Sequence, residues 1–284
     1  MSQINYYSVY KTVVQKLIND EEQLPSLPSI TLKIRQAIAN PNSDHAVIGK
    51  LIQLDPSLST LLLKHATSPI YKRPVPPKTI DGVLAMIGLP TLESLVMAHS
   101  IKSLFVMKSP ELKKLFRLSW ERMILKAAIS LFIAKKLGFR PAEEVMTASI
   151  LSEVGTLAVL SAFNSDLQIP NQKIYFQLCK RYSKSLSTIL LSKWGLEKYL
   201  IQLTQFSGQW DCNKSRQLMM VDIINLAIYS TVQHQSPKND LPAIETLSSY
   251  KKLPPSLNTL SPSKELVIIQ SNLETIDNII ASIR

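Results

Sequence analysis

The chain has 284 residues, with 32 Lys and Arg against 21 Asp and Glu, and a formal net charge of +11. At about 100–200 residues per domain, this length fits one large domain or two modest ones, and a hydrophobic fraction of 45% excludes a wholly disordered chain. Seven glycines are too few for a fold built on tight glycine turns or glycine-rich phosphate loops.

The periodicity of the first 110 residues predicts a series of helices. Apolar residues at i, i+3, i+4 and i+7 predict a helix over residues 6–17. The LPSLPS segment at 24–29 is expected to be extended, because a residue before proline is driven out of the α region. Further helices are predicted to begin at residues with capping side chains or at prolines, namely Ser29, Asp44, Asp55, Thr79 and Pro90.

The rest of the chain is also predicted to be helical. A long helix is expected from Pro110 to Gly138, followed by one central, buried helix over 141–163, which is apolar on most of its circumference. Shorter helices are predicted over 171–182, 185–194, 197–207 and 214–234. No segment has a convincing strand pattern, so the predicted fold class is all-α.

The last 50 residues divide into a loop and an amphipathic helix. Residues 235–262 are rich in Pro, Ser and Asn and poor in pattern, which predicts a loop. From Leu266 to Ile283, leucine and isoleucine recur at steps of three and four. A stripe of under three heptads favours docking on the body of the protein over a coiled-coil homodimer, which stays open as the alternative.

The positive charge is concentrated in two segments. Residues 102–140 contain ten basic and two acidic side chains, and residues 173–216 contain eight basic and two acidic ones. Such concentrations can attract nucleic acid or an acidic partner. However, the basic residues occur singly on helical patterns with no aromatic stacking motif, so solvated helix faces are favoured over nucleic-acid binding.

Motifs that carry chemistry are scarce. The four histidines show no zinc-binding spacing with each other or with Cys179 and Cys212; they are His45, His65, His99 and His234. His65 and His99 fall within apolar helix patterns and are expected to be hydrogen-bonded core residues. The GxSxG, GxxxxGK[ST] and GxGxxG motifs are all absent. Motif search alone therefore identifies no active site.

Nothing in the sequence is typical of export or of membrane insertion. The N-terminal segment has polar residues along its whole length and lacks the apolar core of a signal peptide, and no stretch of 18 apolar residues is free of charge. Two cysteines cannot form a disulfide framework and are expected to be reduced. We therefore expect a cytoplasmic protein with no membrane contact.

Elements between Leu24 and Phe105 resemble the HDOD domain, the HD-related output domain of bacterial signalling proteins. The matching segments are LPSLP at 24–28, Asn40-Pro41, DPSLSTLLLKHATSPIY at 55–71 and TIDGVLAMIGLPTLESLVMA at 79–98. Thr67 stands where the family usually has Asn, and weaker similarity continues to about Gly208. The resemblance implies an HD-like multi-helix bundle with an N-terminal helical subdomain. We divide it into residues 1–110, an HD-like subdomain at 111–235, and the loop and C-terminal helix at 236–284.

The HD superfamily to which this family belongs implies a test for catalysis. Its active members are phosphohydrolases in which helical His and Asp residues hold divalent metal ions. The family's W-x-H-S-L-x-x-A pattern lies over 120–127, and its G-L-L-H-D-I-G pattern matches 149–155. On this correspondence none of the ligand positions holds histidine or aspartate; the degenerate positions are Arg122, Ser152, Glu153, Ser183, Phe206 and Ser207.

These replacements predict that the metal site is lost. One glutamate beside an arginine cannot supply the converging N and O donors that a first-row metal needs, so we expect no divalent metal and no other cofactor. A buried Glu153 must be paired or neutralised, and Arg122 is the expected partner that would plug the site.

The resemblance therefore predicts a non-catalytic bacterial signal-transduction module that acts through a protein partner or a ligand. The exposed loop Tyr71, Lys72 and Arg73 is a candidate interaction surface. Two alternatives stay open. One is a metal-dependent phosphohydrolase of nucleotides or cyclic dinucleotides with a degenerate HD site. The other, less favoured, is a basic nucleic-acid binder.

Overall fold

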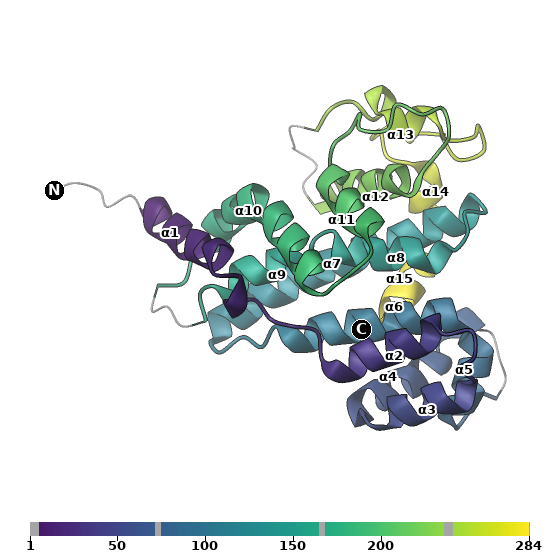
Figure 1. The fold of residues 1–284 in the computed structure, drawn as a ribbon. Helices are drawn as coiled ribbons and strands as arrows, with labels where there is room; N and C mark the ends of the chain where they lie inside the picture. The colour runs from purple at the N-terminus through teal and green to yellow at the C-terminus, as the bar shows by residue number, and fades with distance from the viewer. Residues whose placement is uncertain (1–5, 72–74, 165–167, 236–240, 284) are drawn as a thin grey trace.

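The protein is built from α-helices, as the periodicity predicted (Figure 1). The computed structural model describes residues 6–71, 75–164, 168–235 and 241–283. Within these ranges no β-strand forms, and strand-like pairing is limited to one isolated antiparallel bridge between Leu260 and Leu266.

Helices α2 to α6 form an N-terminal group, seen in the lower part of Figure 1. Predicted caps fix their starts: the Asp44 carboxylate accepts from the Val47 amide at 2.8 Å, and Asp55 and Thr79 cap in the same way. Ser29 is the first residue of its helix and not the predicted cap, a position that Pro28 holds. The helices are α2 (Ser29–Ala39), α3 (His45–Gln53), α4 (Pro56–Ala66), α5 (Ile80–Ile87) and α6 (Leu89–Leu104), with a 3-10 turn η2 (Pro69–Tyr71).

Helices α7 to α12 form the central group, in which long helices pack side by side (Figure 1). They are α7 (Pro110–Lys136), α8 (Ala142–Leu151), α9 (Val154–Ser161), α10 (Gln172–Lys193), α11 (Lys198–Phe206) and α12 (Met220–Gln235). Helix α10 is continuous where two helices were predicted, over 171–182 and 185–194. Its buried stripe runs through the predicted gap, with Tyr182, Leu186 and Leu190 all facing the core.

The helix predicted over 141–163 is broken in two at Ser152 and Glu153. Glu153 has φ −120° and ψ 9°, which are not helical values. Just after it, the Gly155 amide donates to the Ser187 hydroxyl on α10 at 2.8 Å. The break is therefore accompanied by a hydrogen bond from the start of α9 to another helix. Periodicity could not reveal this break, because the apolar residues on both sides are buried all round.

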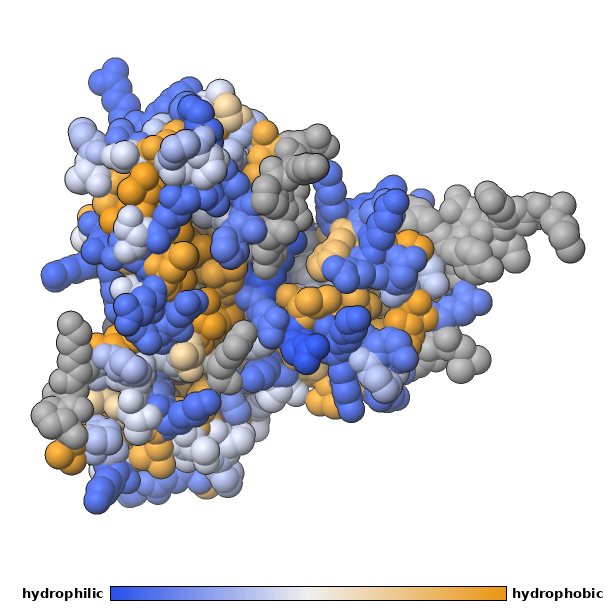
Figure 2. All heavy atoms as spheres, turned by 180° about the vertical axis from the view of Figure 1, so that it is seen from behind, coloured by the Kyte–Doolittle hydropathy of each residue, from blue (hydrophilic) through white to orange (hydrophobic). Residues whose placement is uncertain are grey.

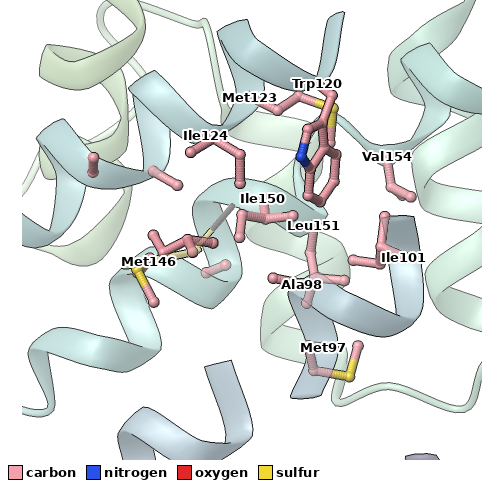
Figure 3. Close-up of a cluster of buried hydrophobic side chains, with 14 of the residues drawn as sticks. Met97, Ala98, Ile101, Trp120, Met123, Ile124, Met146, Ile150, Leu151 and Val154 are labelled. Carbon is pink, nitrogen blue, oxygen red and sulfur yellow. The ribbon is translucent and has the colours of Figure 1, made fainter. Parts of the chain in front are cut away.

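The core of the central group lies where α6, α7 and α8 meet (Figure 3). The side chains in contact there are large and apolar; they include Met97, Ala98, Ile101, Trp120, Met123, Ile124, Met146, Ile150, Leu151 and Val154. Leu151 and Val154 directly flank the break between α8 and α9, and both are at most 1% exposed. The break is therefore held on both sides by packed core residues.

The two ends of the described chain pack onto different parts of the molecule. Near the start, α1 (Tyr6–Asn19) lies against α10, and the Tyr10 ring meets Phe163 edge-on at 5.7 Å between centroids. A 3-10 turn η1 (Glu21–Gln23) then leads into the extended segment before α2. The division of the chain into parts that end at residues 110 and 235, which was made from the sequence, stays a prediction.

The segment after α12 contains more helix than the predicted loop. It has a 3-10 turn η3 (Ile244–Thr246) and short helices α13 (Ser248–Lys251) and α14 (Val267–Gln270), followed by α15 (Leu273–Ile283). The predicted amphipathic helix is interrupted at Ser271 and Asn272, and α15 packs against α7, α4 and η2. The C-terminal helix is docked on the body, as its apolar stripe predicted.

One face of the molecule has a hollow in which hydrophobic residues gather. Seen from behind, the molecule is hollowed between the group of α12–α14 and the group of α2–α5, and hydrophobic residues gather there (Figure 2). Among the described residues, one segment, Ala142–Ser161, is long and apolar enough by length and composition to cross a membrane, and two bent helix pairs pass the same test. In the fold 78% of the most apolar window of Ala142–Ser161 is buried inside the protein, so packing accounts for its hydropathy.

Gly155 is required for the contact between α9 and α10. A Cβ atom at this position would lie 1.9 Å from the Ser183 carbonyl oxygen and 2.5 Å from the Ser187 amide nitrogen. These are backbone atoms, which cannot move aside without separating the two helices. Only glycine allows this closeness.

We expect Gly155→Ala to lower the free energy of unfolding by about 3 kcal/mol or more, because overpacking must push α9 away from α10. The matched control is Gly138→Ala, where φ is +66° and no heavy atom lies within 4 Å of the new Cβ atom. There the left-handed backbone should cost about 1 kcal/mol. Urea unfolding monitored by circular dichroism measures both, and equal losses would contradict the packing role of Gly155.

Candidate functional site

A cavity of about 600 Å³ lies between α7, α10 and α12, beside the break that separates α8 from α9. It brings together five of the six degenerate HD positions, namely Arg122, Ser152, Glu153, Ser183 and Ser207. The sixth, Phe206, does not line the cavity; its side chain points outward and the residue is 45% exposed. The correspondence drawn from the sequence thus converges on one place in the fold.

Helix α10 supplies one wall of the cavity through a single face. Its lining residues follow the i, i+3, i+4, i+7, i+8 spacing of neighbouring side chains on a helix; they are Phe176, Cys179, Lys180, Ser183 and Lys184. The cavity is also lined by Ser119, Arg122 and Met123 of α7 and by four apolar side chains, Trp210, Ile228, Val232 and Leu241.

The carboxylate of Glu153 is paired chiefly with a residue that the sequence analysis did not select. Lys126 Nζ lies 3.3 Å from Glu153 Oε2, whereas Arg122 Nη2 lies 4.0 Å from Oε1. Lys126 is only 1% exposed, and its ammonium also donates to Ser152 Oγ at 2.9 Å. Arg122 was expected as the partner of Glu153, but it is the more distant of two cations.

Lys126 carried a signal that could have identified it. It is the only charged residue between Arg122 and Lys135, in a stretch of α7 that is otherwise apolar apart from Ser130. It also lies four residues after Arg122, which puts both on one helix face. A lysine in such a stretch is rarely buried unless it is paired, and the pairing is what the fold provides.

The pKa of Glu153 is determined more by its neighbouring positive charges than by its burial. Burial alone would raise the pKa of this carboxyl, but the positive charges of Lys126 and Arg122 hold the pKa below its ordinary value. Burial lowers the pKa of Lys126, and the charge of Glu153 opposes that shift. The pair is therefore a fixed, internally compensated element of the cavity wall.

The cavity lacks an activated nucleophile among the described residues. Burial raises the pKa of the Cys179 thiol to about 12, so the thiol stays protonated at neutral pH. The Ser207 hydroxyl donates to the Thr204 carbonyl oxygen at 2.8 Å, and no histidine lines the cavity within the described chain to act as a general base.

The residues present do not fit the metal that the HD superfamily implies. The one carboxylate in the cavity wall is already neutralised by Lys126, and Arg122 would repel a cation. In the described ranges no three His, Cys, Asp or Glu side chains converge on a point. No reaction step can be derived through a metal at this site.

The predicted interaction loop is described only at its first residue. Tyr71 is half-buried, and its hydroxyl lies 2.6 Å from His65 Nε2, while His65 Nδ1 lies 2.7 Å from the Ser282 carbonyl oxygen on α15. Lys72 and Arg73 lie outside the described residues. His65 is thus a hydrogen-bonded core histidine, as predicted, and Tyr71 serves the docking of the C-terminal helix.

Comparison with known proteins identifies the family. Residues 24–209 match the family model of the HDOD domain. The match spans more than half of the chain, so the chain belongs to the HDOD family, and the resemblance seen in the sequence is confirmed. No curated protein matches the chain.

Solved structures share the fold over nearly the whole chain. A Shewanella amazonensis protein described as a candidate metal-dependent phosphohydrolase is 17% identical, with a TM-score of 0.74 over 98% of this chain and 100% of that one. An HDOD domain protein with unknown function from Geobacter sulfurreducens is 19% identical, with a TM-score of 0.66 over 97% of both chains. A candidate signal transduction protein from Marinobacter aquaeolei is 14% identical, with a TM-score of 0.64 over 100% of this chain and 67% of that one. These likenesses confirm the predicted all-α, HD-like fold.

We expect Lys126→Met to lower the free energy of unfolding by about 3 kcal/mol, because it leaves a half-buried carboxylate without its nearest cation. Adding Glu153→Gln should recover at least about 1 kcal/mol of that loss, since the two side chains are directly coupled. Exposed Lys113→Met on the same helix is the control and should change stability by less than about 0.5 kcal/mol. Denaturant titration of Lys126→Met, Glu153→Gln, the double variant and Lys113→Met measures the coupling, and strictly additive losses would contradict it.

The same pair predicts a pH dependence. Because the folded-state pKa of Glu153 is lowered, its ionisation stabilises the fold at pH above the ordinary value of 4.5, and this contribution is lost as the pH falls through the lower folded-state pKa. The difference in unfolding free energy between the wild type and Glu153→Gln should be constant at neutral pH and shrink on acidification. A difference that does not change down to the acid unfolding of the wild type would contradict the lowered pKa.

Proposed function

We propose that this protein is a non-catalytic regulatory module that receives a ligand or a protein partner and transmits its binding through helix packing. The observation that carries the proposal is the Lys126–Glu153 ion pair, with Arg122 beside it. On the motif correspondence, Arg122 and Glu153 stand at positions where active HD proteins have metal ligands. The two cations compensate the charge of the Glu153 carboxylate, as a metal ion would, but they cannot activate water as a metal ion does. The proposal keeps a cytoplasmic location and a partner in a signalling pathway.

The arrangement of α7 supports a role in transmission. This helix has 27 residues and is therefore about 40 Å long. One part of it lines the cavity with Ser119, Arg122 and Met123, and a later part, including Leu131 and Phe132, lies beside the C-terminal helix α15. A shift of α7 caused by binding in the cavity would move the surface on which α15 is docked.

The alternative function is a metal-dependent phosphohydrolase. The description of the Shewanella protein names such an activity for that protein, but 17% identity carries the fold and not the site. The donor chemistry of this chain opposes it, because activation of water needs a metal or a base. Nucleic-acid binding loses part of its support as well, since Lys126, one of the basic residues of 102–140, is buried in an ion pair.

We expect the purified protein to show no turnover of bis(p-nitrophenyl) phosphate above background with Mg²⁺, Mn²⁺, Fe²⁺ or Zn²⁺. Elemental analysis should find no stoichiometric divalent metal, because the cavity offers one carboxylate that is already paired. An active HD-type phosphodiesterase assayed in parallel is the positive control. Turnover that disappears in Glu153→Gln and persists in Glu111→Gln, an exposed glutamate of α7, would overturn the proposal.

A further inference from the structure

We propose that the cavity binds a small organic phosphate that carries a flat ring, with Arg122, Lys180 and Lys184 recognising the phosphate and Phe176 and Trp210 receiving the ring. This inference deepens the proposed function, on which it rests, by naming the chemical class of the ligand that would regulate the module. It is carried by the charge, shape and lining of the cavity.

The cavity wall carries an excess of positive charge. Arg122, Lys180 and Lys184 line it, and its one acidic residue, Glu153, is already compensated by buried Lys126. No carboxylate of the described chain lies within ion-pair distance of Lys180 or Lys184. Three cations therefore line a cavity whose one acidic residue is already paired, and this excess of positive charge favours an anion of more than one charge.

The cations come from two helices that line the cavity, α7 and α10. Lys180 and Lys184 are four residues apart on α10, so they project from the same face, with Ser183 between them. Arg122 stands on α7, in the same cavity, with its side chain 34% exposed and its one described carboxylate contact long, at 4.0 Å. Its guanidinium has five N–H donors, enough to keep that contact and still bind phosphate oxygens.

Apolar and aromatic side chains also line the cavity. Ile228 and Val232 come from α12, Trp210 and Leu241 come from the segments before and after it, and Phe176 adds a second ring from α10. The Trp210 ring is held edge-on by Tyr229, with 5.9 Å between centroids. A fixed aromatic surface can stack on a flat heterocycle, an interaction that does not depend on which base is offered.

The size of the cavity selects a small molecule over a polymer. About 600 Å³ is within the range of about 300–1,000 Å³ of small-molecule sites. A nucleic-acid helix needs an extended basic surface, whereas these cations line a cavity together with apolar side chains. A mononucleotide has both a phosphate group for the cations and a flat base for the aromatic rings.

The test uses adenosine 5′-monophosphate and two fragments of it as probes, adenosine without the phosphate and ribose 5-phosphate without the base. Isothermal titration calorimetry should detect binding of the mononucleotide with a Kd below about 1 mM and binding of each fragment at least about tenfold weaker. Raising the salt from about 50 to 500 mM should weaken mononucleotide binding, because screening acts on the phosphate contacts.

Three variants assign the binding to this cavity. Lys184→Gln and Lys180→Gln, at exposed positions, should each weaken mononucleotide binding by about tenfold, while the control Lys173→Gln, an exposed α10 residue outside the cavity, should leave it within about twofold. Trp210→Ala should weaken the mononucleotide and leave ribose 5-phosphate unaffected. Thermal unfolding of each variant without ligand checks that it is folded.

Absence of saturable binding, or binding that all three lysine variants affect equally, would overturn the inference. So would tighter binding of a single-stranded RNA oligonucleotide through the same lysines, because it would assign the cations to a polymer. Product analysis by liquid chromatography separates the two proposals. Hydrolysis of the bound mononucleotide would refute the non-catalytic function and keep the site, whereas failure to bind without any turnover would refute the site alone.

Discussion

A lysine sealed inside a helical core is the constraint around which this site is organised. Lys126 is 1% exposed, and an ammonium taken out of water is stable only with compensating charge and hydrogen bonds. Glu153 supplies the charge and Ser152 a hydrogen-bond acceptor, both from the break between α8 and α9. The break, the acidic residue and the lysine are therefore parts of one arrangement, and none of them is stable in this form without the others.

The pairing of Glu153 with Lys126 also determines the net charge of the cavity wall. A carboxylate that faced the cavity unpaired would offset one of the cations in the wall, but Glu153 is held by Lys126 from within the core. The charge of Arg122, Lys180 and Lys184 is then not cancelled. The cavity therefore carries an excess of positive charge at the positions where the resemblance to the HD superfamily would imply a site for cations.

Local features of the fold could be predicted from the sequence, and long-range ones could not. The caps at Asp44, Asp55 and Thr79 depend on residues within three positions, so the sequence pattern suffices for them. The break at Ser152 and Glu153 depends on Ser187, some 30 residues away, and no periodicity reports it. The place of Arg122 and Glu153 in one cavity came from family resemblance, while Lys126 was missed because the same motif has no fixed residue there.

Gly155, the last residue of the segment that matches the superfamily motif, is required for packing and not for chemistry. The His and Asp of the superfamily pattern are replaced at Ser152 and Glu153, yet Gly155 persists. Its reason is steric, because a Cβ atom there would meet the backbone of α10 at 1.9 Å. Packing constraints act on the fold whether or not a metal is bound, so they outlast the ligands. Resemblance to an enzyme superfamily can therefore be specific over the helices of a chain whatever residues stand at the ligand positions.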